Sequence, residues 1–113
     1  MRDETFTVAD GFLVRRVITN GRLYQHRCPL AAYERIAIEI DDLKGAVFTQ
    51  TDLVERFQAA GQPIPSSQIA AATAFLEQRG VLDAVEGGRK AATPSVRIDA
   101  MIEFHALRGG DRP

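Results

Sequence analysis

The sequence predicts an α+β domain, in which a β-hairpin is followed by three helices, a shorter second hairpin and a terminal helix. Three observations support this prediction: β-branched residues around an Asn-Gly pair, apolar residues at helical spacing in the middle of the chain, and a Gly-Gly pair between two short strand-like stretches. The chain has 113 residues, of which 45% are hydrophobic and 26% are charged. This length and composition suit one globular domain with a single core, so we take 1–113 as that domain.

The first hairpin is expected over residues 12–28. Its strands are Phe12–Ile18 and Arg22–Arg27, which are rich in β-branched and aromatic residues. Asn20 and Gly21 both tolerate a positive φ, which the two central residues of the turn require. We take the residues before this hairpin as a polar lead-in.

The tip of this hairpin is predicted to be apolar on both faces. Val17 lies opposite Tyr24 and Ile18 lies opposite Leu23, and adjacent pairs point to opposite sides of the hairpin. One small domain covers only one side, so a second surface must cover the other. We therefore expect a homodimer whose interface is formed by the hairpin and the terminal helix: Val17, Ile18, Leu23, Tyr24, Met101 and Phe104.

Two helices are expected in the first half of residues 29–93. Apolar residues recur every three or four positions from Leu30 to Leu43, which predicts an amphipathic helix with an acidic outer side. Thr49 and Asp52 have the spacing of a capping box, so a short second helix is predicted to begin there.

A third helix, a hairpin and a terminal helix complete the predicted domain. The third helix begins at Ser66 or Ser67 and stops at Gly80, and Gly87-Gly88 forms the turn of the second hairpin. The terminal helix is expected over 97–107, followed by a flexible tail at 108–113. The predicted core consists of Leu30, Tyr33, Ile36, Ile40, Leu53, Phe57, Ile69, Phe75, Leu76 and Leu82.

The order of these elements resembles the winged helix-turn-helix domain, which is common among bacterial transcription regulators. The stretches that carry the resemblance are 48–53, 66–76 and 77–82, the last of which has a charged residue and a glycine before the first wing strand. The resemblance implies a winged-helix-like domain of three helices plus a two-stranded wing, preceded by the N-terminal hairpin and followed by the C-terminal helix. It further implies a small DNA-binding transcriptional regulator, which would contact double-stranded DNA through Ser67, Gln68, Arg89 and Lys90.

The predicted recognition helix departs from the usual DNA-binding pattern. Helices that read base edges carry Arg, Lys, Asn or Gln near their N-terminal end, whereas here Gln68 stands among serines and alanines. The net charge of −1 and pI of about 6.1 also weaken a role that depends on attracting phosphate. The alternative is a protein-interaction module on a winged-helix scaffold, which binds a protein partner and no DNA.

Charge is unevenly distributed along the chain. Residues 11–33 contain four arginines and no acidic residue, whereas residues 34–55 contain six acidic residues and two basic ones. The arginines of the first hairpin could form a ribbon that contacts phosphate or a partner, and we name Arg15, Arg16 and Arg22 for that role. The alternative is a solvated hairpin whose charges discourage pairing at its edge.

No pattern of catalytic residues is present in the sequence. We find no nucleophile beside a base and no glycine-rich phosphate loop, so we expect no enzyme, no catalytic residue and no cofactor. His26 and Cys28 point the same way in an extended strand, but two ligands do not make a metal site, and we expect no metal. For Cys28, a buried apolar role is favoured over a reactive thiolate at the start of a helix.

The apolar runs of the sequence are short and interrupted by charge. They are shorter than a membrane span requires, and the first residues lack the apolar region of a signal peptide. We therefore expect a cytoplasmic protein that does not contact a membrane.

Overall fold

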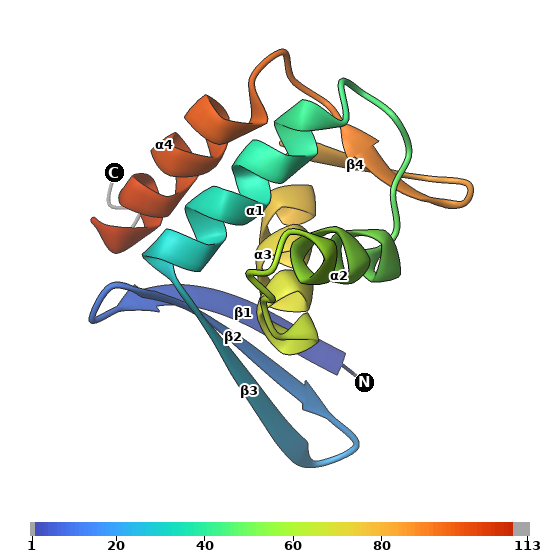
Figure 1. Cartoon of the computed structure of the whole chain (residues 1–113). Coiled ribbons are helices and arrows are strands. Elements are labelled where there is room, and N and C mark those ends of the chain that lie inside the picture. Colours follow the sequence, from blue (N-terminus) through green and yellow to red (C-terminus); the bar gives the residue numbers. More distant parts are fainter. Residues whose placement is uncertain (1, 110–113) are drawn as a thin grey trace.

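The computed structural model describes residues 2–109 and has an α+β fold (Figure 1). In this part of the chain a three-stranded antiparallel sheet lies beneath the helices, and a two-stranded antiparallel sheet projects to one side. The elements are, in order, β1 (Arg2–Ala9), β2 (Phe12–Thr19), β3 (Arg22–Pro29), α1 (Leu30–Asp42), α2 (Gln50–Ala59), α3 (Ser66–Gln78), β4 (Leu82–Val85), β5 (Gly88–Ala91) and α4 (Val96–Arg108). The predicted tail begins at the last residue of α4, and its residues 110–113 lie outside the described part.

The polar lead-in predicted before the first hairpin is instead a strand. β1 pairs with β2 over its whole length, so the predicted two-stranded hairpin is part of a three-stranded sheet in the order β1-β2-β3. Asp10 and Gly11 both have positive φ, 55° and 79°, as the central residues of a tight hairpin turn require. Asn20 and Gly21 form the second turn in the same way, with φ of 51° and 75°.

The two faces of the three-stranded sheet have different surroundings. The predicted pairing of β2 with β3 is confirmed, with Val17 opposite Tyr24 and Ile18 opposite Leu23. Side chains alternate between the faces, so Phe6, Leu13 and Cys28 are buried beneath the helices with Val17 on the same face. The alternate positions lie on the outer face, where Val14 on the central strand is 6% exposed and the following side chains are exposed: Asp3, Thr5, Thr7, Ala9, Arg16, Ile18, Leu23, Gln25 and Arg27.

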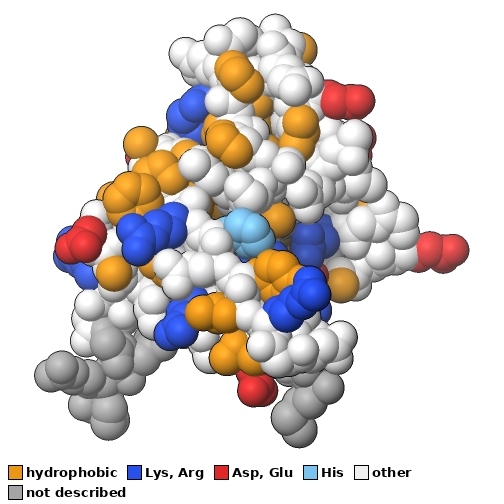
Figure 2. Space-filling model, turned by 90° about the horizontal axis from the view of Figure 1, so that it is seen from below, with side chains coloured by type: hydrophobic (Ala, Val, Ile, Leu, Met, Phe, Trp, Pro, Cys, Tyr) orange, Lys and Arg blue, Asp and Glu red, His pale blue; other side chains and the backbone are white. Residues whose placement is uncertain are grey.

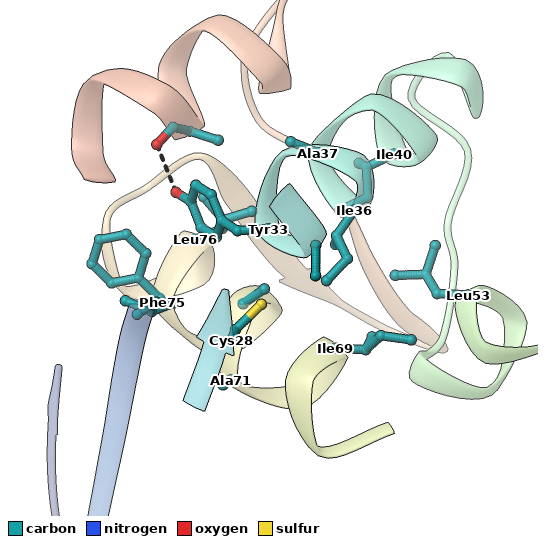
Figure 3. Packing of buried hydrophobic residues seen from close by; sticks show 14 of the residues in the cluster. Cys28, Tyr33, Ile36, Ala37, Ile40, Leu53, Ile69, Ala71, Phe75 and Leu76 are labelled. Carbon is teal, nitrogen blue, oxygen red and sulfur yellow. Dashed lines mark hydrogen bonds between the residues drawn. The ribbon is translucent and has the colours of Figure 1, made fainter. Parts of the chain in front are cut away.

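The core lies between the sheet and the four helices (Figure 3). α3 packs on the inner face of the sheet against β2 and β3, where the rings of Phe6 and Phe75 are 5.3 Å apart. Tyr33 lies at the centre of the core, and its hydroxyl donates a hydrogen bond of 2.6 Å to the carbonyl oxygen of Ala100. Burial raises the pKa of Tyr33, so this hydroxyl keeps its proton. The predicted core residues are buried, apart from Leu30, which is half-buried.

The terminal helix α4 is attached to α1 through its first turn. The carboxylate of Asp41 accepts hydrogen bonds from the backbone N–H groups of Val96 (2.7 Å) and Arg97 (2.9 Å). The first N–H groups of a helix have no partner within the helix, so this carboxylate satisfies two of them and balances the positive end of the helix dipole. Arg97 also pairs with Glu34 on α1, at 2.8 Å.

The two-stranded sheet is linked to the chain before α2. Phe48 exchanges two backbone hydrogen bonds with Arg89, of 2.8 and 2.9 Å. This pairing requires glycine at position 88, where φ is 151° and an added Cβ would lie 2.2 Å from the carbonyl oxygen of Phe48. The predicted capping box is confirmed, because Thr49 and Asp52 bond reciprocally at the start of α2.

Truncating a fully buried core side chain should strongly destabilise the fold. Ile36 and Leu76 are 0% exposed, so Ile36→Ala or Leu76→Ala should lower the free energy of unfolding by about 2–5 kcal/mol through lost burial and a residual cavity. Urea unfolding followed by circular dichroism measures this loss. Ile102→Ala is the control, because its side chain is 56% exposed and its truncation should cost about 0.5 kcal/mol or less. Equal losses at buried and exposed positions would contradict the described core.

Removing the carboxylate that caps α4 should weaken the attachment of this helix. Asp41→Ala leaves the N–H groups of Val96 and Arg97 without their partner and should cost about 1–2 kcal/mol in unfolding free energy. The neighbouring Asp42→Ala is the matched control, since Asp42 is exposed and should contribute about 0.5 kcal/mol or less. If both variants unfold at the same urea concentration, Asp41 does not act as the cap.

Candidate functional site

The predicted recognition helix α3 is covered on most of its circumference. It contacts α1, α2, β4 and the inner face of the three-stranded sheet. The part that stays open is a narrow strip, which includes the exposed Ser66 and Gln78 and the half-buried Ala70 and Ala74. The residues of α3 that are buried are Ile69, Ala71, Ala72, Thr73, Phe75 and Leu76.

The two base-reading residues predicted on α3 are both half-buried. Ser67 lies near the open strip, one turn from Ala70. Residues two apart on a helix point to nearly opposite sides, so Gln68 is directed away from Ala70. The side chain with the best hydrogen-bonding pattern for reading a base is therefore not on the open strip.

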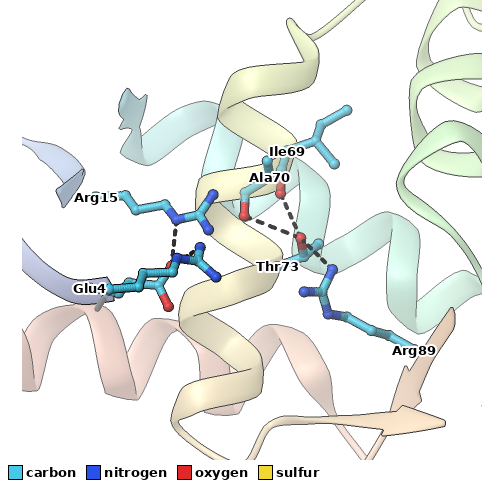
Figure 4. A network of polar contacts seen from close by, with 7 residues as sticks. Glu4, Arg15, Ile69, Ala70, Thr73 and Arg89 are labelled. Carbon is cyan, nitrogen blue, oxygen red and sulfur yellow. Dashed lines mark hydrogen bonds and ion pairs between the residues drawn. The ribbon is translucent and has the colours of Figure 1, made fainter. Parts of the chain in front are cut away.

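The arginine predicted to contact DNA from the wing is bound within the chain (Figure 4). Arg89 on β5 donates to the carboxylate of Glu77 at 2.7 Å and to the hydroxyl of Thr73 at 3.2 Å. The hydroxyl of Thr73 in turn donates to the carbonyl oxygen of Ile69 at 2.9 Å. These bonds attach β5 to α3, whereas Lys90 on the same strand is exposed.

On the other side of α3, an arginine of the sheet is bound in the same way (Figure 4). Arg15 on β2 donates to the carboxylate of Glu4 on β1 at 2.6 Å, and its side chain is 16% exposed. Arg15 and Arg89 thus lie on opposite sides of the helix, and a carboxylate neutralises each of them. Neither is a free cation for phosphate.

The remaining arginines of β2 and β3 are exposed and form no ion pair in the described part of the chain, whereas Arg2 on β1 pairs with Glu4 at 3.8 Å. Within the described residues, Arg16, Arg22 and Arg27 form no ion pair. Figure 2 shows the molecule from the side on which the sheet lies, with basic and hydrophobic side chains interspersed over its middle and acidic side chains near its margin. Of the three residues predicted to contact phosphate or a partner, Arg16 and Arg22 are therefore available, and Arg27 joins them.

Some residues of the predicted dimer interface are buried within the chain, and others are exposed. Val17 is 7% and Phe104 is 1% exposed, so both belong to the chain's own core and cannot contact a partner. Ile18, Leu23 and Tyr24 are 46%, 52% and 45% exposed, as the prediction requires.

Of the two α4 residues predicted for the interface, Phe104 lies on the face that packs against the core. Val96, Ala100 and Phe104 face the core, whereas the opposite face carries the exposed side chains of Ile98 and Ile102. The half-buried Met101 lies between these two faces, beside a shallow apolar hollow. The apolar residues of α4 occupy most of its circumference, and only their contacts show which of them are buried.

Cys28 is a buried structural residue. Its side chain is fully enclosed, and burial raises the pKa of its thiol from 9.0 to about 12. The thiol is therefore neutral near neutral pH, in contrast to a redox-sensing thiolate. Nδ1 of the nearby His26 is buried and has no hydrogen-bond partner, and residues 2–109 contain no group of three or more His, Cys, Asp or Glu placed to hold a metal ion.

Comparison with known proteins gives no match to any family model, curated protein or solved structure. Within the described part of the chain, the helices are too short or too polar to cross a bilayer. The function must therefore be inferred from the residues themselves.

The thiol of Cys28 should react with disulfide reagents only after unfolding. With 5,5′-dithiobis(2-nitrobenzoic acid) at about pH 8, the folded protein should react far more slowly than the urea-unfolded chain, because attack requires an accessible thiolate. The raised pKa also stabilises the fold below pH 9, and this contribution is lost as pH rises from about 9 towards 12. Equal labelling rates in the two states would show that Cys28 is accessible.

Proposed function

We propose that this chain is a protein-interaction module on a winged-helix-like scaffold. The scaffold is supported by the order of its elements and by the bridge of Phe48 with Arg89, which links the chain before α2 to the two-stranded sheet. In the proposed scaffold α3 would correspond to the recognition helix, and β4 and β5 to the wing. The observation that carries the proposal is made on α3, which has no basic residue along its length and whose flanking arginines, Arg15 and Arg89, are both bound to carboxylates.

The surface of α3 and its two flanking arginines is poorly suited to binding duplex DNA. Contacts between cationic side chains and phosphate supply most of the affinity of DNA-binding proteins. Around α3, binding would first have to break the pairs of Arg15 with Glu4 and of Arg89 with Glu77. The acidic side chains of these pairs would then lie close to the phosphates and repel them.

Exposed apolar side chains support binding to protein. They lie at the tip of the β2–β3 hairpin, in Ile18, Leu23 and Tyr24, and on α4, in Ile98 and Ile102. Apolar side chains gathered on a surface and surrounded by polar residues are typical of protein-binding sites.

The DNA-binding regulator is the second candidate function. Its support is the set of exposed cations on the sheet and wing, Arg16, Arg22 and Lys90, together with the wing-like position of β4 and β5. A duplex would then contact the sheet and the wing through phosphate alone, without base contacts from α3.

A duplex-binding titration distinguishes the two functions. The protein should not bind a mixed-sequence DNA duplex, even at about 50 mM salt, where phosphate contacts are strongest. Fluorescence anisotropy of a labelled duplex measures this. Two results together would overturn the proposal in favour of the regulator. The logarithm of the affinity for the duplex would fall as the logarithm of the salt concentration rises, and Lys90→Glu would weaken the binding. Lys90 is used because Arg89 is part of the fold.

A further inference from the structure

The outer edge of β3 has backbone groups without partners in the sheet. β2 is the sole sheet neighbour of β3 among the described strands. In a two-residue hairpin the residues next to the turn exchange both hydrogen bonds, and bonded pairs then alternate along the strands. Counting from the pair Thr19 and Arg22, the N–H and C=O groups of Leu23, Gln25 and Arg27 point away from β2.

Charged side chains are the main protection of this edge against a further strand. Proteins block exposed edges with charged residues, prolines, bulges, very short strands or a covering element. Arg22 and Arg27 are charges of this kind, which repel a cationic strand and attract an acidic one. The pairing of β2 with β3 is continuous over eight residue pairs, and the one proline of β3 is its last residue. The distal part of the hairpin extends beyond the helices (Figure 1), and Arg22, Leu23, Tyr24 and Gln25 are all exposed.

The side chains along this edge are cationic and apolar. Arg22 and Arg27 lie on β3 and Arg16 lies beside them on β2, all three exposed and without ion pairs in the described part of the chain. Between the two arginines of β3 are the exposed side chains of Leu23 and Tyr24. No acidic residue occurs on β2 or β3.

We propose that this edge binds an acidic protein segment in an extended conformation, which adds to the sheet as a fourth strand beside β3. The inference rests on the proposed interaction function and specifies its partner and its site. The backbone of the segment pairs with Leu23, Gln25 and Arg27. Arg27 lies on the outer face of the sheet and Arg22 on the inner face, so the carboxylates of an alternating acidic segment face one of these two arginines, according to its phase. Apolar residues on the other side of the segment then contact Tyr24 when the carboxylates face Arg27, or Leu23 when they face Arg22.

The same charges disfavour the other occupants. A second copy paired through β3 would bring Arg22 and Arg27 near the same two arginines of its partner, and like charges across strands repel. A nucleic acid would satisfy the arginines but would leave the row of backbone donors and acceptors of the edge without strand partners. An acidic extended segment satisfies both the charges and the backbone.

The test uses a fluorescent octapeptide of four Glu-Val repeats as the probe. The protein should bind it saturably by fluorescence anisotropy, and should bind the Lys-Val peptide of equal length about tenfold more weakly or not at all. The double variant Arg22→Glu with Arg27→Glu should weaken binding of the acidic peptide about tenfold or more. Both side chains are exposed, so circular dichroism should show the fold unchanged.

Two controls separate strand addition from attraction by charge alone. Lys90→Glu with Arg108→Glu makes the same change in total charge at exposed positions away from the sheet, and should leave peptide affinity within about twofold. Two further Glu-Val peptides carry N-methyl groups on alternate residues, one on the odd positions and one on the even positions. Both keep their charge but lose half of their backbone donors, and at least one of them should bind about tenfold more weakly. Equal losses in the two double variants, or full affinity of both methylated peptides, would overturn strand addition.

The remaining outcomes distinguish this inference from the proposed function. If neither the peptide nor the DNA duplex binds, the β3 edge is not the site, and the interaction function stands with the α4 face as its surface. If the DNA duplex binds, and the double variant Arg22→Glu with Arg27→Glu abolishes that binding, both the acidic-segment inference and the proposed interaction function are overturned. In place of the homodimer expected from the sequence, light scattering of the unmodified protein should give the mass of a monomer. A dimer that the same double variant dissociates would make the occupant a second copy and overturn the acidic segment.

Discussion

The fold depends on the packing of α3 against the inner face of the three-stranded sheet. Phe75 on α3 contacts the ring of Phe6 on one side and lies near Tyr33 on the other, so one side chain joins the sheet to the helices. This position requires small residues on α3, and Ala71 and Ala72 are both fully buried. The small side chains of α3 thus allow the sheet and the neighbouring helices to approach it closely.

Five arginines of the first sheet and of β5 divide into two groups with different roles. Arg15 and Arg89 are bound to carboxylates beside α3 and connect β2 and β5 to their neighbours. Arg16, Arg22 and Arg27 lie on the sheet without such partners, so their charge is available to another molecule. The net charge of −1 conceals this division, because the acidic residues that offset these arginines lie on other elements.

Local patterns predicted much of the fold, but contacts between distant residues determined which predicted surfaces are open. The capping box at Thr49 and the register around Asn20 depend on neighbouring residues and were predictable. β1 was missed because its outer-face residues are polar, although Asp10-Gly11 is the same kind of turn signal as Asn20-Gly21. The pairing of Arg89 with Glu77 and the burial of Val17 and Phe104 depend on tertiary packing, so the predicted site and interface were only partly correct.

The capping of α4 by Asp41 also has a kinetic consequence. The bond from Val96 joins residues 55 positions apart, so the intervening chain must be ordered before the cap can form. Closing a long loop costs conformational entropy before any contact is gained, and such contacts form late in folding. We therefore expect α4 to dock last and to detach first, which would briefly uncover Tyr33 and Phe104. Hydrogen exchange should then be faster along α4 than along the buried α3.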